Sequence, residues 1–311
     1  MLKLEEGFKL RIMKIAVLMT CHNRCEKTLR CLHSLYCLDN SYHFSIDVFL
    51  VDDGSTDNTS ESVSLFYNKV FLIQGSGNLF WNRGMREAWK AAIKQDYYDY
   101  FIWLNDDTIL YNDALNVVIG DSLLAGNHSI ICGSFQNTEN GTFSYGGKTK
   151  DGCPIFPNGT LQELFYMNGN FVLVPYSVYK KIGILDSHYW HHLGDYDYGL
   201  VARHAGLKVF VASQYVGICA RNENGTNRIR KSGVGIRERL RYLNTPMSLS
   251  LKTAFYFYKK NFNIIYAIYK VLLEIIIVVF PDKVYNQYKN LFKKRVFIWV
   301  IEFVYLLKEL Y

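Results

Sequence analysis

The chain has 311 residues, of which 50% are hydrophobic and 20% charged, and it carries a formal net charge of +7. This composition excludes an intrinsically disordered protein, because the apolar surface is sufficient to offset the entropy lost on ordering. The charge is uneven: residues 1–220 have a net charge of −4, residues 221–241 of +5 and residues 251–311 of +6. The acidic part predicts a cation site. The basic parts indicate either solvated faces or contacts with phosphates and anionic lipid, and no nucleic-acid partner is expected.

The cysteines and the N-terminus indicate a cytoplasmic protein. Four of the seven cysteines lie close together, but their spacings do not match a zinc site and no CxxC occurs. Free thiols in a reducing compartment are therefore expected. Residues 1–13 show no signal peptide and are expected to form an N-terminal extension.

Short apolar runs alternate with helical patterns along the first third of the chain. The apolar runs predict strands at residues 14–20, 46–51, 70–73 and 100–104. The helical patterns lie at residues 25–38, from 56–59 onward, and at 83–95. This alternation predicts an α/β fold with a mostly parallel central sheet flanked by helices. Ligands of such sheets bind beyond the carboxyl ends of the strands, where polar clusters occur at residues 20–24, 52–57 and 105–108.

The rest of the chain shows weaker periodicity. Residues 131–175 are rich in Gly, Asn and aromatic residues and predict irregular strands and loops that form the half of the domain that faces an acceptor. A helix is expected at residues 196–205 and a further strand at 207–212. We therefore expect a catalytic domain over residues 14–245, followed by a helical region over residues 246–311.

The first polar cluster contains Thr20, Cys21, Asn23 and Arg24, directly after the first strand. It lacks the G-x-G-x-x-G fingerprint, which argues against a dinucleotide-binding domain. It also lacks the glycine-rich loop of sugar nucleotidyltransferases. The segment instead resembles the opening of family 2 glycosyltransferases, in which a strand ends in T/P-x-x-N-R/K. The resemblance implies that these four residues bind a nucleotide sugar.

The second cluster, Val51–Asp57, resembles the V-D-D-G-S-x-D signature of the same family. The resemblance implies that Asp53 accepts a hydrogen bond from the nucleobase. The chemistry fits, since a carboxylate at a strand end can accept an imino N–H and Gly54 permits a tight turn. The alternative is an ordinary strand, turn and helix with an aspartate cap.

Residues 75–86 resemble the G-N-x-x-x-x-x-G segment that precedes a helix in this family. The resemblance implies that Asn78 contacts the base and that Arg83 or Arg86 contacts a phosphate. The alternative is a glycine-rich loop and helix start whose arginines face solvent.

The third cluster consists of Asn105, Asp106 and Asp107. Two adjacent carboxylates at one strand end are costly unless a cation neutralises them. The cluster resembles the D-x-D region of the family, with Asn in the first place. This implies that Asp107 ligates Mg²⁺ or Mn²⁺, while Asp106 or Asn105 contacts the ribose or metal-bound water. Many relatives carry a later histidine ligand, but residues 219–226 contain none, so weak metal binding is expected.

The fourth cluster, Tyr189–Leu200, resembles the E/G-D-x-D/E-x-x-x-R-x-x-x-G segment of the family. Asp195 matches the general base, which takes the proton of the acceptor hydroxyl in an inverting transfer. Asp197 is expected to orient the acceptor or to cap the helix. Other residues expected at the sugar or the acceptor, with packing as the alternative for the aromatic ones, are Asn168, Gly169, Trp190 and His192.

The resemblance covers residues 14–220 and implies a GT-A nucleotide-diphospho-sugar transferase fold of the bacterial polysaccharide, rhamnosyltransferase-like type. The implied activity is inverting, metal-dependent transfer from a nucleotide-sugar donor to a glycan or lipid-linked acceptor. Processive synthases of the family carry a Q-x-x-R-W motif that this sequence lacks, so transfer of a single sugar is expected. The alternative is a non-catalytic nucleotide-sugar-binding subunit of a membrane assembly.

The C-terminal region predicts helices with basic and aromatic residues. Residues 263–280 are apolar but contain Lys270 and Glu274, and each central charge costs about 2.5–3.5 kcal/mol in a membrane span. After Pro281, a second amphipathic helix is expected over residues 285–310. These patterns favour a peripheral position on the inner face of the plasma membrane over a helical cap or a dimer interface. An oligomer is compatible with the sequence.

Overall fold

A computed structural model describes residues 12–221, 234–243, 245–246 and 250–280. Its centre is a ten-stranded sheet of order β3-β2-β1-β4-β9-β6-β10-β5, in which β7 pairs with β6 and β8 with β10. The first four strands are parallel, as the sequence predicts. Their bounds are β1 Met13–Cys21, β2 Phe44–Asp52, β3 Val70–Gln74 and β4 Tyr100–Leu104.

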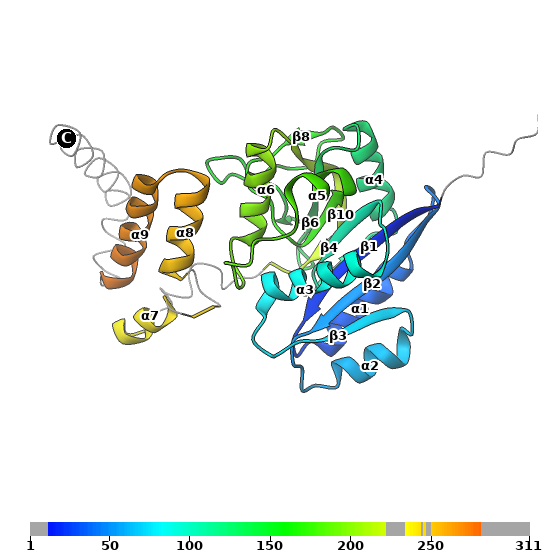
Figure 1. Ribbon diagram of the computed structural model, residues 1–311, viewed down its shortest axis with the longest axis horizontal. Helices are drawn as coiled ribbons and strands as arrows, with labels where there is room; N and C mark the ends of the chain where they lie inside the picture. The colour runs from blue at the N-terminus through cyan, green and yellow to red at the C-terminus, as the bar shows by residue number, and fades with distance from the viewer. Residues whose placement is uncertain (1–11, 222–233, 244, 247–249, 281–311) are drawn as a thin grey trace, which may run out of the picture.

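The helices that connect these strands cover both faces of the sheet (Figure 1). They are α1 Cys25–Tyr36, α2 Thr59–Phe66 and α3 Phe80–Gln95. Along β1, Val17 and Met19 pack with Leu32 of α1 in one core cluster, whereas Leu18 packs with Trp89 of α3 in a second cluster. Alternate side chains of a strand point to opposite faces of the sheet, so α1 covers one face of β1 and α3 covers the other.

The second half of the sheet is more regular than the sequence indicates. Its elements are β5 Thr108–Leu110, α4 Ala114–Leu124, β6 Ile130–Gln136, β7 Phe143–Tyr145, β8 Gln162–Glu163, β9 Phe171–Pro175, α5 Tyr176–Ile182, α6 Gly194–His204 and β10 Val209–Cys219. Strand β9 lies between β4 and β6 and runs antiparallel to both. Residues 131–175 thus contain strands, as expected, although β6 and β9 are regular where irregular strands are predicted, and α4 has no counterpart among the expected elements.

Among the described residues after β10, the helices are α7 Ile236–Tyr242, α8 Leu251–Asn261 and α9 Ile264–Val279. Figure 1 shows α8 between α9 and α6, and α8 contacts both of them. Within the described ranges, no helix has the length and apolar character needed to cross a membrane. The expected helix over residues 285–310 and most of the N-terminal extension lie outside the described residues.

Candidate functional site

The first three polar clusters meet at the carboxyl ends of β1, β2 and β4. The backbone N–H of Asp53 donates to the carbonyl of Cys21, and that of Asn23 donates to the hydroxyl of Ser55, which joins the first two clusters. Nη1 of Arg24 donates to Oδ1 of Asp106 at 2.9 Å and to Oδ2 of Asp107 at 3.1 Å, which joins the first and third. Parallel neighbours thus bring these segments together as the sequence predicts.

Asp106 and Asp107 form an acidic pair, and both carboxylates make an ion pair with Arg24. Burial raises the pKa of Asp106 to about 6; Arg24 opposes this shift, and the charge of Asp107 adds to it. The Asp107 side chain is 30% exposed and that of Arg24 is 46% exposed. A half-exposed guanidinium therefore balances two carboxylates, which leaves the pair short of positive charge.

The donor set fits a divalent cation that is bound jointly with a substrate. Among the described residues, no group of three or more His, Cys, Asp or Glu side chains is arranged to hold a metal ion. Mg²⁺ is commonly bound through one or two carboxylates together with substrate phosphates. Asp106 and Asp107 can supply those carboxylates, and a donor diphosphate can supply the remaining oxygens.

Asp53 organises the loop before α3. Its Oδ1 accepts from the backbone N–H of Gly77 at 2.8 Å, and its Oδ2 accepts from those of Leu79 and Phe80 at 2.8 and 2.9 Å. Phe80 has φ +57°, a left-handed conformation that is strained for a bulky residue, and the carboxylate holds it there. The structure thus gives Asp53 three backbone partners, where the sequence predicts a contact with the nucleobase.

Trp81 connects the acidic pair to the second half of the site. Its Nε1 donates to Oδ1 of Asn105 at 2.7 Å. A Cβ added to Gly169 would lie 2.5 Å from the Trp81 ring, so glycine permits this close approach. The backbone N–H of Gly169 in turn donates to Oδ2 of Asp195 at 3.0 Å. The contacts Asn105–Trp81–Gly169–Asp195 therefore link the segment of the acidic pair to the segment of the candidate base.

Asp195 lies half-buried in the first turn of α6. Its Oδ1 accepts from the backbone N–H of Tyr196 at 2.9 Å, and Oδ2 accepts from Gly169. Burial raises the pKa of Asp195, while the two backbone hydrogen bonds and nearby His192 act in the opposite direction. A carboxylate with a raised pKa is a stronger proton acceptor, which suits a general base.

The loop before Asp195 is fixed to α3 through Asn82. The backbone N–H of Asn82 donates to the Trp190 carbonyl at 2.9 Å, and its side-chain amide donates to the carbonyls of Tyr189 and Asp186 at 3.0 and 2.8 Å. The Arg83 guanidinium carbon lies 3.5 Å from the Trp190 ring centroid. Arg83 is therefore engaged in a cation–π contact on this loop, where the sequence predicts a phosphate contact.

Three other predicted residues do not present their side chains as expected. The Cys21 thiol is packed in the α1-side core cluster. Asp197 is only 2% exposed, and its carboxylate accepts from Tyr189, Lys260 and Asn261, so it is not available to orient an acceptor. Thr20 packs against Gly84 of α3.

The remaining predicted residues are partly or fully exposed. Asn78 and His192 are exposed, and Trp190 and Asn168 are half-buried. The Asn23 amide oxygen accepts from the backbone and the hydroxyl of Thr56. Trp81 is the residue that sequence reasoning missed; an aromatic residue directly after a glycine-rich loop was the available signal.

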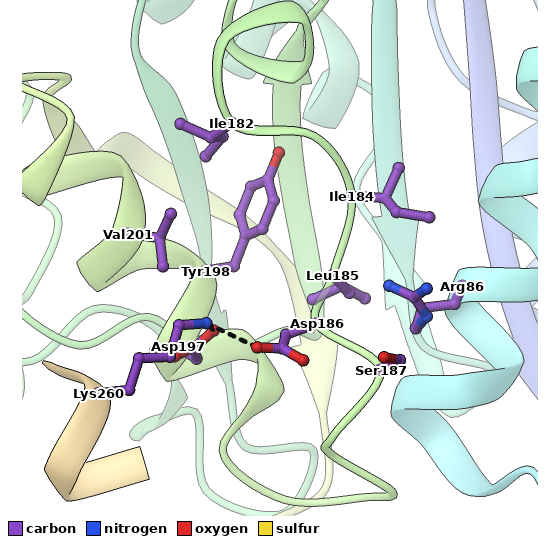
Figure 2. A pocket seen from close by; sticks show the side chains of 10 residues that line it. All are labelled: Arg86, Ile182, Ile184, Leu185, Asp186, Ser187, Asp197, Tyr198, Val201 and Lys260. Atoms are coloured by element: carbon purple, nitrogen blue, oxygen red, sulfur yellow. Dashed lines mark hydrogen bonds and ion pairs between the residues drawn. The ribbon is translucent and has the colours of Figure 1, made fainter. Parts of the chain in front are cut away.

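A cavity of about 300 Å³ lies apart from the motif residues (Figure 2). Figure 2 shows Arg86 of α3 on one wall, with Asp186, Asp197 and Lys260 on the other. Two residues in its lining, Asp197 and Arg86, are ones that the sequence assigns to the site, Arg86 as the alternative to Arg83 for a phosphate. The cavity therefore adjoins the back of the loop over residues 186–197, apart from the acidic pair.

The sequence and the fold can both be compared with known proteins. The family model described as "Glycosyl transferase family 2" matches residues 16–183. A poly-beta-1,6-N-acetyl-D-glucosamine synthase of Staphylococcus epidermidis is 27% identical over 187 residues, which cover 56% of this chain and 42% of the relative. The corresponding synthase of Staphylococcus aureus (strain COL) is 28% identical over 190 residues, again covering 42% of its length. The matches thus span less than half of these relatives.

Solved structures show the same fold. S. aureus TarS 1-349 in complex with UDP-GlcNAc has a TM-score of 0.53 and 15% identity, and the alignment covers 84% of this chain and 81% of that chain. The mannosyltransferase PcManGT from Pyrobaculum calidifontis, in complex with GDP-Man and Mn²⁺, has a TM-score of 0.51 and 14% identity, with coverage of 96% and 86%. At these identities the similarity concerns the fold, a GT-A arrangement of a mixed sheet flanked by helices.

Proposed function

Because the chain belongs to glycosyl transferase family 2, we propose that it transfers a single sugar from a nucleotide-sugar donor to a glycan or lipid-linked acceptor, with inversion at the anomeric carbon. The observation that carries this proposal is the set of contacts that links the segment of the acidic pair, Asp106 and Asp107, to Asp195 through Trp81 and Gly169. A donor diphosphate needs a cation at one end of such a site, and an acceptor hydroxyl needs a base at the other.

The proposed reaction is one displacement. Asp195 takes the proton of the acceptor hydroxyl as that oxygen forms a bond to the anomeric carbon. The bond between the anomeric carbon and the diphosphate breaks on the opposite face, and the nucleoside diphosphate leaves with the bonding electrons. The two backbone hydrogen bonds to the Asp195 carboxylate orient it for this transfer.

Asp106 and Asp107 would hold a divalent cation, Mg²⁺ or Mn²⁺. When bound, the cation would neutralise the charge that develops on the departing diphosphate. Arg24 already contacts both carboxylates, so its guanidinium is placed to contact the same diphosphate.

The biological setting is proposed from the relatives. The two relatives described above are poly-beta-1,6-N-acetyl-D-glucosamine synthases, and the two solved structures described above hold UDP-GlcNAc or GDP-Man. We place this chain in the assembly of a bacterial surface polysaccharide. The absence of a Q-x-x-R-W motif from the sequence supports single transfer.

A peripheral position on the inner face of the plasma membrane is also proposed. Ile264, Ile268 and Leu272 are 44–50% exposed and follow one another at helical spacing on α9, which gives an apolar stripe. The net charge of +6 over residues 251–311 favours anionic lipid. Co-sedimentation with phosphatidylglycerol vesicles tests this, since equal partition with phosphatidylcholine vesicles would contradict an electrostatic contribution.

Activity and metal dependence are tested together with a panel of UDP-, GDP- and dTDP-sugars. We expect turnover of at least one donor with Mn²⁺ or Mg²⁺ and its loss with excess chelator, because the acidic pair lacks a sufficient protein counter-charge. We expect Asp107→Asn to raise the metal concentration needed for half-maximal rate by at least tenfold. Donor binding without turnover for any acceptor would instead identify a non-catalytic nucleotide-sugar-binding subunit.

A further inference from the structure

Helix α8 holds both ends of the loop that carries the candidate base. Asp186 lies at the start of this loop and Asp197 at its end, in the first turn of α6. Between them lie Trp190, His192 and Asp195, the residues assigned to the acceptor side. A group that joins Asp186 to Asp197 therefore fixes the segment that the transfer reaction uses.

Lys260 of α8 joins the side chains of Asp186 and Asp197. Its Nζ donates to Oδ2 of Asp186 at 2.8 Å, the contact drawn as a dashed line in Figure 2, and to Oδ2 of Asp197 at 2.6 Å. The Lys260 side chain is 30% exposed and that of Asp197 is 3% exposed. A buried carboxylate is stable only when it is paired and hydrogen-bonded, so this ammonium is the principal counter-charge of Asp197.

Neighbouring residues of α8 complete the attachment. The Tyr256 hydroxyl donates to Oδ2 of Asp186 at 2.9 Å, and its ring stacks on His188 with centroids 4.2 Å apart. The Asn261 amide donates to Oδ1 of Asp197 at 2.7 Å, the oxygen that also accepts from the buried Tyr189 hydroxyl. The polar contacts of α8 thus reach both carboxylates that bound the loop.

Helices α3 and α8 hold the loop from two sides. On the α3 side, Asn82 donates hydrogen bonds to the loop backbone, and a cavity of about 300 Å³ lies between the loop and this helix. On the α8 side, the buried Tyr189 of the loop packs with Phe257. The Lys260 bridge adds the contact that joins the two ends of the loop to each other.

We propose that Lys260 is a positioning residue for the transfer reaction, and that α8 contributes to the acceptor side of the site. The bridge from Lys260 to Asp186 and Asp197 sets the orientation of the first turn of α6, and with it the direction of the Asp195 carboxylate. This inference rests on the proposed function of Asp195 as base. It changes the expected organisation, in which residues from 246 onward form an appendage to the catalytic domain.

The test compares Lys260→Met with Lys259→Met, a matched change at the exposed neighbouring lysine of the same helix. We expect Lys260→Met to lower kcat at least tenfold while the Kd values for UDP, GDP and dTDP, used as probes in the presence of Mn²⁺, stay within twofold of wild type. Lys260→Arg should restore kcat to within about threefold of wild type, because it keeps the charge. Lys259→Met should behave as wild type.

The outcomes separate this inference from the proposed function. If wild type transfers sugar and Asp195→Asn does not, but Lys260→Met keeps the kcat of Lys259→Met, the inference is wrong and the proposed function stands. Loss of nucleotide binding together with kcat in a folded Lys260→Met protein would also overturn it. If Lys260→Met does not fold, the comparison is made between Tyr256→Phe and its control Tyr258→Phe. We expect kcat to fall threefold or more in Tyr256→Phe only. Equal kcat values in the two variants overturn the proposal.

Discussion

Replacing Asp195 with asparagine is expected to lower kcat for sugar transfer by about 10²–10⁴-fold, the usual contribution of a general base. The amide cannot take the proton of the acceptor hydroxyl, although it can still accept the hydrogen bond from Gly169. Donor affinity should stay within twofold of wild type, because the donor contacts assigned above lie on other segments. Initial rates with saturating donor and acceptor, and nucleotide titrations with Mn²⁺, measure the two quantities.

The pH dependence of the wild-type rate gives a second readout of the same group. The base must be deprotonated, so kcat falls as pH drops through the pKa of Asp195. Burial raises this pKa, and the acidic limb is therefore expected above the value of about 3.9 for an unperturbed aspartate. Asp151→Asn, at an exposed carboxylate that the site does not use, serves as the control and should leave the rate and its pH profile unchanged. Transfer at the normal rate by Asp195→Asn would show that another group is the base.

Replacing Asp53 with alanine is expected to lower the free energy of unfolding by about 3 kcal/mol and to raise the donor KM at least tenfold. The change removes the acceptor of three backbone N–H groups, and each unsatisfied buried donor costs about 1–3 kcal/mol, part of which water entering the loop recovers. The loop before α3 then loses the conformation that places Trp81 between the two halves of the site. Urea denaturation and donor kinetics check the two effects.

Asp53→Asn is the informative companion to this change. Its amide keeps one accepting oxygen and should therefore lie between wild type and Asp53→Ala in stability. The sequence resemblance assigns Asp53 to the nucleobase, and that role makes a different prediction. If Asp53→Ala weakens donor binding but unfolds at the same urea concentration as wild type, the Asp53 carboxylate binds the nucleobase, and its role in organising the loop is minor.

The sequence predicts the first half of the fold well, because each buried parallel strand there is an apolar run that ends in a polar turn. The second half differs for a physical reason. Helix α4 is apolar around most of its circumference, as in Leu115–Ile119, so it shows no helical period. Strands β6 and β9 are buried along nearly their whole length and carry no alternation that would separate them from the Gly- and Asn-rich loops around them.

The sequence predicts which segments meet at the site, because this follows from the order of the strands. It predicts less well in which direction each side chain points. Asp106 and Asp107 follow a strand, and their meeting with Arg24 follows from the parallel sheet. Cys21 lies two residues after Met19 on β1 and shares its buried face, a rule of period two that the sequence already contains. Residues two apart on a helix diverge, which is why Asp197 faces α8 when Asp195 faces Gly169.

Other parts of the site required coordinates. The approach of Trp81 to Gly169 depends on a missing Cβ and on two segments far apart in the chain. The bridge formed by Lys260 depends on α8 packing against α6. Neither contact corresponds to a pattern of residue spacing that could be recognised in the sequence.

The central claim is that Asp106, Asp107 and Asp195 line one site for a nucleotide sugar. Anomalous diffraction from crystals of the full chain soaked with Mn²⁺ and UDP or GDP tests it most directly. The account predicts a Mn²⁺ peak in contact with the carboxylate of Asp106 or Asp107, with the nucleotide diphosphate beside it on the side of Trp81 and Gly169. A nucleotide bound instead in the cavity beside Arg86 and Lys260, with the contacts of Arg24 to the acidic pair unchanged, would contradict the account.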